Sequence, residues 1–337
     1  MSETSRDPYP RFAELPVQAG APPGSSWGVF GDDDQVGTLN FITPESVAAA
    51  ARLVRKGQTF SLNLPLNLPD PPFANREPYR HTMMTIGEGR ARDDYLDNFY
   101  LQRSSQWDAL SHICHLRHGF YNGVRPDEVT GTDGSKLGIE HWAARGIAGR
   151  GVLLDVARYM AAQGQSLDPQ QWFAIGPPLI DAVLQAQSVT LQDGDILLLR
   201  TGWVAYYLAA SQAEREACNP EHGSPGLAAG EEMAAYLWDH RVAAIGADNM
   251  AVEAMPPSRQ TGGFLHNRLI PLLGMAIGEM WDLEGLADDC AADGVYECLL
   301  TSAPLHLCGG VGSPPNALAL KLIFKGLCLN RIIFKYL

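Results

Sequence analysis

The segment from Ser104 to Asn122 concentrates side chains that can do chemistry, because a carboxylate, a glutamine and three of the chain's nine histidines lie within nineteen residues. Gln106 and Asp108 are two positions apart, so they project from the same face of an extended segment. His112 follows Asp108 by four positions, and one helical turn would return it to that side. Convergent carboxylate and imidazole groups favour a divalent metal site or a general acid–base pair. A polar loop with scattered histidines is the alternative on spacing alone.

A hydrolytic metal site needs several protein ligands and an open position for water. Outside the first segment, His266 and Glu279 are the candidates, although a histidine is more often a core or surface residue and a glutamate more often a surface acid. We therefore group Asp108, His266 and Glu279 as potential ligands, with Gln106 as a weaker neutral oxygen donor. His112 would act beside them as a proton shuttle.

The composition narrows the functional class. The chain has 337 residues, of which 46% are hydrophobic and 19% charged, as expected for a soluble globular protein with an ample core. Its formal net charge of −13, without any block of basic residues, argues against nucleic acid as a partner.

Compartment signals are sparse. The polar N-terminus lacks the apolar region of a secretory signal, and no apolar run reaches the ~20 residues needed to span a bilayer. Six cysteines lie far apart without any Cys-x-x-Cys pair, which argues against a zinc ribbon or redox motif. We therefore expect reduced thiols, a cytoplasmic location and no membrane partner.

Local patterns predict strands alternating with helices. Thr43-Pro44-Glu45 is typical of a helix start, and the helix should end near Arg55. Continuously apolar strands such as 151–156 indicate burial on both faces, as in an α/β layer structure. Residues 87–97 are expected to be a mobile, charged connection. Further strands are predicted at 59–66, 81–86, 242–249 and from 196 onward, with a helix at 231–240.

These segments together resemble the cyclase family, which includes bacterial kynurenine formamidases and isatin hydrolases. The family signature is His-x-Gly-Thr-His-x-Asp-x-Pro-x-His. On this chain it places Gln102 and Gln106 at the two leading histidines, Asp108 at the aspartate, Leu110 at the proline and His112 at the last histidine. Gln-Trp-Asp is a recognisable variant of this pattern. The resemblance extends over 27–40, 95–112, 137–159, 195–203, 243–256 and 265–279.

The resemblance also implies a metal site. In relatives with two metals, the leading histidines and the aspartate bind one ion, while the aspartate, a late histidine and a late glutamate bind the other. The late pair is similar to His266 and Glu279. Because both leading histidines are replaced, the resemblance implies one Zn or Mn ion held by Asp108, His266 and Glu279, with Gln106 as a further candidate ligand.

The implied activity is hydrolysis of an amide, lactam or ester carbonyl in a small substrate. Metal-bound hydroxide would attack the carbonyl, and His112 would be the general acid/base. Trp107, Phe120 and Tyr121 could form an apolar wall suited to an aromatic or cyclic substrate, or could simply pack in the core. Two other readings stay open: a binding protein or pseudo-enzyme without a complete metal site, and a metal-independent lyase or cyclase that uses His112 and Asp108.

The resemblance implies a single α/β domain with a mixed sheet and flanking helices, of the swivelling β/β/α kind. We place this hydrolase domain at 27–325, between an N-terminal arm (1–26) and a C-terminal tail (326–337). Relatives form dimers or tetramers, so we expect a homodimer or homotetramer that acts on a small molecule.

Overall fold

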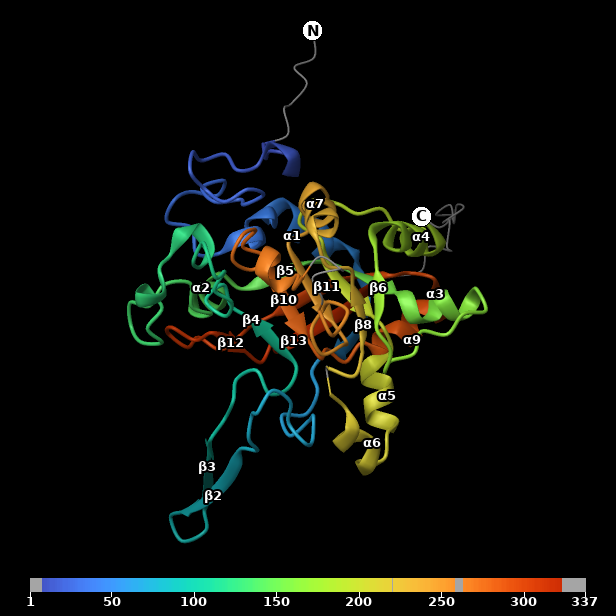
Figure 1. Ribbon diagram of the computed structural model, residues 1–337. Coiled ribbons are helices and arrows are strands. Elements are labelled where there is room, and N and C mark those ends of the chain that lie inside the picture. The colour runs from blue at the N-terminus through green and yellow to red at the C-terminus, as the bar shows by residue number, and fades with distance from the viewer. Residues whose placement is uncertain (1–7, 220, 258–262, 323–337) are drawn as a thin grey trace, which may run out of the picture.

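A nine-stranded mixed sheet forms the centre of the computed structural model, which describes residues 8–219, 221–257 and 263–322 (Figure 1). Its order is β1-β13-β11-β5-β7-β9-β10-β4-β12, and helices flank it, which confirms the predicted α/β class. The predicted tail at 326–337 lies outside the described residues. The strands are β1 Val54–Ser61, β4 Gln106–Asp108, β5 Ile147–Asp155, β7 Ile196–Arg200, β9 Ala244–Ala247, β10 Ala276–Glu279, β11 Glu297–Ser302, β12 Gly312–Ser313 and β13 Ala317–Leu322.

The middle of this sheet is parallel, because β5 pairs with β7, β7 with β9 and β9 with β10 in the same direction. All residues of β9 and β10 are buried, as expected for strands covered on both faces. The α-helices are α1 Pro44–Leu53, α2 Glu140–Arg145, α3 Val156–Ala162, α4 Pro177–Gln187, α5 Trp203–Ala209, α6 Gln212–Ala217, α7 Glu231–Asp239, α8 His266–Leu269 and α9 Glu284–Asp293.

The first helix begins as predicted. Thr43 caps it by accepting a hydrogen bond from the Ser46 amide at 3.1 Å, and a proline occupies its first turn. However, α1 ends at Leu53, and β1 starts at Val54 rather than at residue 59. The early start follows from pairing with β13, since Val54 lies opposite Leu322. Such a long-range partner is invisible in local patterns.

Residues 87–97 are not the connection that the sequence predicts, because β3 (Ala91–Asp97) pairs in full register with β2 (Arg80–Ile86). The hairpin projects away from the body (Figure 1). An ion pair between Arg80 and Asp97 and a 2.7 Å contact between His81 Nε2 and Asp94 Oδ2 link its strands. A ribbon exposed on both faces has no need for the apolar alternation that identifies strands in sequence. A smaller parallel pair joins β6 (Phe173–Ile175) to β8 (Pro225–Leu227).

The described part of the N-terminal segment packs against the body. The Phe12 amide donates to Asp239 Oδ1 at 2.7 Å, the Trp238 indole donates to the Pro10 carbonyl at 2.9 Å, and the Ser26 amide donates to the Leu272 carbonyl at 2.9 Å. In the part of the chain that the structure describes, no helix has the length and apolar character to cross a bilayer.

Tight packing between β9 and the Trp281 ring predicts a stability effect. A Cβ on Gly246 would lie 2.8 Å from Cε3 of Trp281, a fully buried ring, whereas a Cβ on Gly285 of α9 meets nothing closer than 3.5 Å. We expect Gly246→Ala to lower the free energy of unfolding by about 2 kcal/mol through overpacking. Gly285→Ala, the matched control, should be neutral or stabilising because alanine favours helices. Denaturant unfolding measures both, and equal effects would contradict this packing.

Candidate metal centre

The centre is built on the pairing of β4 with β10. These strands run antiparallel, with Gln106 opposite Glu279 and Asp108 opposite Ile277. Strand alternation places Gln106 and Asp108 on one face, as their spacing predicts, and Trp107 on the other. Trp107 packs edge-on against Trp281, with ring centroids 4.8 Å apart.

The three aromatic side chains considered for a substrate wall belong to the core instead. Trp107 and Tyr121 are fully buried, and Phe120 is 8% exposed. The Trp107 indole donates to Ser302 Oγ at 2.9 Å, and the Tyr121 hydroxyl donates to Asp34 at 3.1 Å. Their role here is packing.

Asp108, His266 and Glu279 converge, although the last two lie 158 or more positions after the first. Each offers a ligand atom, and these atoms lie within 4.8 Å of one another. His266 Nε2 is 3.1 Å from Glu279 Oε1 and 3.7 Å from Asp108 Oδ2. All three residues are buried. The sequence therefore selected the members of this cluster, and the fold brings them together.

Glu253 is a site residue that the sequence did not reveal. It is fully buried, and its carboxylate accepts hydrogen bonds from His266 Nδ1 and from the backbone amides of Leu265 and His266. Donation from Nδ1 leaves the Nε2 lone pair directed at Asp108 and Glu279, which is the arrangement of a metal-binding histidine. A glutamate in an otherwise apolar stretch was the only available signal.

The cluster has more acidic than basic groups, because three carboxyl groups surround the His266 ring. Burial alone would lower the pKa of His266, but the nearby carboxylates of Asp108, Glu253 and Glu279 hold it well above its usual value. Burial, together with the Asp108 carboxylate, raises the pKa of Glu279 to about 7. Burial opposes ionisation of Asp108 as well, yet His112 and His266 keep its pKa below the usual value. Such a set is stabilised by a cation, whether a proton or a metal ion.

The residues present fit a metal ion. Asp108 Oδ2 is buried and has no hydrogen-bond partner, although it lies beside an imidazole nitrogen and a second carboxylate. A metal ion would satisfy this oxygen, whose desolvation is otherwise uncompensated. Two carboxylates and one imidazole are a donor set that Zn²⁺ and Mn²⁺ accept, and three ligands leave room for water.

The two glutamines act as hydrogen-bond donors. Gln102 Nε2 donates to Asp108 Oδ1, and Gln106 Nε2 donates to Glu279 Oε2 at 2.7 Å and to Asp108 Oδ1 at 3.2 Å. Their amide groups thus stabilise the carboxylate oxygens that face away from His266 by hydrogen bonding. In this orientation the nitrogen of Gln106 faces the carboxylates and its buried oxygen has no partner, so its role as a ligand stays a prediction.

His112 lies at the edge of the cluster, and a turn closed by its amide and the Ala109 carbonyl replaces the predicted helical turn. Its Nε2 is 4.0 Å from Asp108 Oδ1, and its side chain is 27% exposed. Burial lowers its pKa against the opposing effect of Asp108, so the ring is neutral near pH 7. Arg76, which the sequence did not single out, is close enough to contribute to lowering the pKa of both His112 and Glu279.

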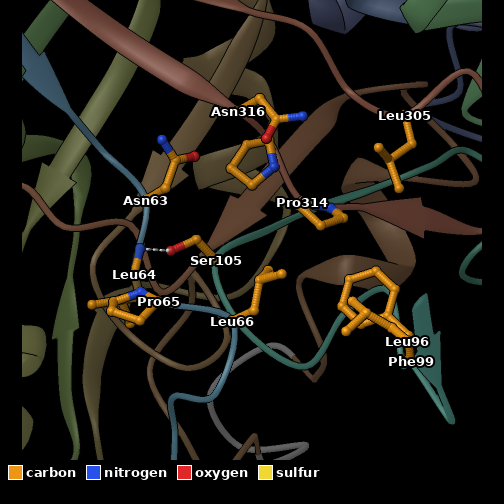
Figure 2. Close-up of a pocket in the computed structure, with 11 residues that line it drawn as sticks. Asn63, Leu64, Pro65, Leu66, Leu96, Phe99, Ser105, Leu305, Pro314 and Asn316 are labelled. Carbon is orange, nitrogen blue, oxygen red and sulfur yellow. Dashed lines mark hydrogen bonds between the residues drawn. The ribbon is translucent and has the colours of Figure 1, made fainter. Parts of the chain in front are cut away.

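An apolar cavity of about 380 Å³ lies at the base of the β2–β3 hairpin (Figure 2). Its walls include Leu66, Leu96 and Phe99, and Ser105 reaches it just before β4 begins. Ser105 Oγ accepts a hydrogen bond from the Leu64 amide at 2.8 Å. None of the metal-centre residues lines this cavity, so it is a separate feature.

Comparisons with known proteins agree with the resemblance. The family model described as "Putative cyclase" matches residues 61–254. A crystal structure of a novel cyclase is 38% identical, with a TM-score of 0.77, and the match covers 88% of this chain and 99% of that one. No curated protein matches the chain.

Two isatin hydrolases share the fold at low identity. Isatin hydrolase A from Labrenzia aggregata is 18% identical with a TM-score of 0.54, over 80% of this chain and 94% of that one. The enzyme from Ralstonia solanacearum is 16% identical with a TM-score of 0.56, over 82% and 97%. The family model matches more than half of the sequence, and the novel cyclase is 38% identical over most of both chains, so the chain belongs to the cyclase family.

Proposed function

We propose that this protein is a metal-dependent hydrolase that cleaves an amide, lactam or ester carbonyl of a small aromatic or cyclic substrate. The observation that carries the proposal is the buried convergence of Asp108, His266 and Glu279, with one carboxylate oxygen unpartnered. Membership of the cyclase family and the fold shared with isatin hydrolases support it. We further propose a cytoplasmic location, with which the five free cysteines of the described part are consistent.

Asp108, His266 and Glu279 would hold one Zn²⁺ or Mn²⁺ ion. When bound, such an ion polarises a carbonyl oxygen and lowers the pKa of water toward ~7. Glu253 holds the proton of His266 on Nδ1 and thereby keeps Nε2 available. The amides of Gln102 and Gln106 hold the carboxylates in place and stabilise their negative charge by hydrogen bonding.

His112 would be the general acid/base. The Gln102 amide lies 3.2 Å from His112 Nδ1 and donates there, which leaves the proton of the neutral ring on Nε2. The opposite amide orientation would set the Gln102 oxygen against Asp108 and is disfavoured. The neutral ring would first act as a base and take a proton from the attacking water; the imidazolium so formed would then give a proton from Nε2 to the leaving nitrogen or oxygen.

Metal content and turnover test the proposal together. Protein purified without chelator should carry close to one Zn or Mn per chain, and Asp108→Asn should lose both metal and hydrolysis because a ligand is removed. His112→Asn should keep the metal but lower kcat by about 10²–10⁴-fold, because only proton transfer is removed. Elemental analysis and assays on amide, lactam and ester panels measure this. Full activity in metal-free protein would sink the proposal.

One observation favours a second candidate, a binding protein or pseudo-enzyme. The amides of Gln102 and Gln106 already donate three hydrogen bonds to the carboxylates of Asp108 and Glu279 without any metal. If the protein is such a binding protein without a metal, neither EDTA nor added Mn²⁺ should change its melting temperature. A metal that binds the native state must raise the melting temperature.

Glu253 provides a test of how the centre is held. Glu253→Gln should weaken Zn²⁺ or Mn²⁺ binding by about 10–100-fold, because a charged partner of the ligating imidazole is lost. The matched control is Glu232→Gln, a change at an exposed position in the first turn of α7. Calorimetric titration of chelator-treated protein gives both affinities. Unchanged affinity in Glu253→Gln would show that His266 needs no such orientation.

We also propose that the chain is a homodimer or homotetramer joined through the β2–β3 hairpin. Met84, Ile86 and Tyr95 are exposed on one face of this ribbon, and an isolated two-stranded hairpin is marginal in water. Two hairpins packed face to face would bury these apolar side chains.

The oligomeric state follows from that contact. Met84→Asp combined with Tyr95→Asp should convert the assembly to monomers, because charges would enter the shared apolar face. Leu116→Asp, at a fully exposed leucine elsewhere, should leave it intact. Light scattering gives the mass in solution, and a monomeric wild type would refute the proposal.

A further inference from the structure

A second concave site lies beside the metal centre, and basic side chains line it without any acidic one. It is a pocket of about 360 Å³ formed by the loop after His112, by α8 and by the segment that precedes α8. No acidic side chain is among its lining residues, although the chain contains 38 acidic and 25 basic residues. Its polar and aromatic lining comprises His115, Arg117, His118, Phe264, Asn267 and Arg268.

The two guanidinium groups of this pocket lack counter-charges. Within the described residues, neither the Arg117 side chain nor the Arg268 side chain forms an ion pair or hydrogen bond. By contrast, Arg150, Arg158 and Arg200 each bind a carboxylate at 2.9 Å or less. Arg117 is exposed and Arg268 half-buried, so both guanidinium groups are open to an anion that enters the pocket.

Two histidines of the pocket lie beside these arginines. The rings of His115 and His118 stack with centroids 4.6 Å apart. Burial lowers the pKa of His115, and the neighbouring His118, Arg117 and Arg268 lower it further. These three groups are thus close enough to His115 to oppose a positive charge on its ring. A bound anion would relieve this repulsion.

The pocket adjoins the proposed catalytic machinery. Asn267 and Arg268 directly follow His266 in α8, and the pocket histidines lie on the loop that carries His112. Phe264 forms part of the pocket wall, and its ring stacks on His266 with centroids 4.4 Å apart and planes inclined by 4°. One aromatic ring therefore separates the pocket from the metal-binding imidazole.

We propose that this pocket binds an oxyanion, a carboxylate or phosphate group, through Arg117 and Arg268. Planar guanidinium groups recognise both anions by paired hydrogen bonds, and the Asn267 amide can supply another donor. The anion would come either from a substrate that extends from the metal centre or from a free anion that occupies the pocket beside it. The first source rests on the proposed hydrolase function, whereas binding itself does not.

Binding is tested on the full chain after EDTA treatment, so that its outcome is independent of hydrolysis. Inorganic phosphate and succinate are titrated by calorimetry into the wild type, into Arg117→Gln/Arg268→Gln and into the control Arg125→Gln, whose exposed arginine pairs with Asp127. We expect the wild type and the control to bind at least one of the two anions, and the double variant to lose at least ~10-fold in affinity. Absence of wild-type binding, or equal binding by the double variant, would overturn the proposal.

The source of the anion is separated with metal-loaded protein. If the substrate supplies it, the double variant should raise KM for carboxylated members of a substrate panel and leave kcat and the KM of uncharged analogues unchanged. If the pocket takes a free anion, phosphate should bind while charged and uncharged substrates respond equally to the substitutions. Both results support an oxyanion site. Unimpaired phosphate binding in the double variant contradicts it even when hydrolysis is absent.

Discussion

The pairing of β4 with β10 is the constraint on which the site depends. Three residues of β4 place two polar side chains toward the centre and insert Trp107 into the core between Trp281 and Trp142. Large buried rings fix the strand, because neighbouring side chains cannot shift without opening a void. The position of Asp108 therefore follows from aromatic packing on the opposite face of β4, and pairing with β10 places Glu279 opposite Gln106.

Electrostatics then determine what this geometry can hold. Three buried carboxylates surround one imidazole, and two glutamine amides compensate only part of the charge. Groups of like sign in a poorly solvated volume remain ionised only with a cation among them. His112, nearer to solvent, stays neutral because it is partly buried and has only a distant contact with Asp108. The buried cluster is thus suited to ion binding, and His112 at its edge is suited to proton transfer.

The two glutamines link the sequence to the number of metal positions. A histidine offers a lone pair to a cation, whereas a glutamine amide offers hydrogen atoms to a carboxylate. Positions 102 and 106 carry glutamines, and both amides donate hydrogen bonds to carboxylate oxygens. A centre with one metal is consistent with this arrangement, and the positive pocket on the far side of Phe264 offers a separate place for negative charge.

Local sequence determined the α/β class, the start of α1 at Thr43 and the shared face of Gln106 and Asp108, because capping and strand alternation act between near neighbours. The resemblance to the cyclase family also indicated His266 and Glu279. Only the tertiary structure decided that these residues meet, that Glu253 supports His266, that Trp107 belongs to the core and that residues 91–97 form a strand. Each of these depends on contacts between distant segments, which no local pattern encodes.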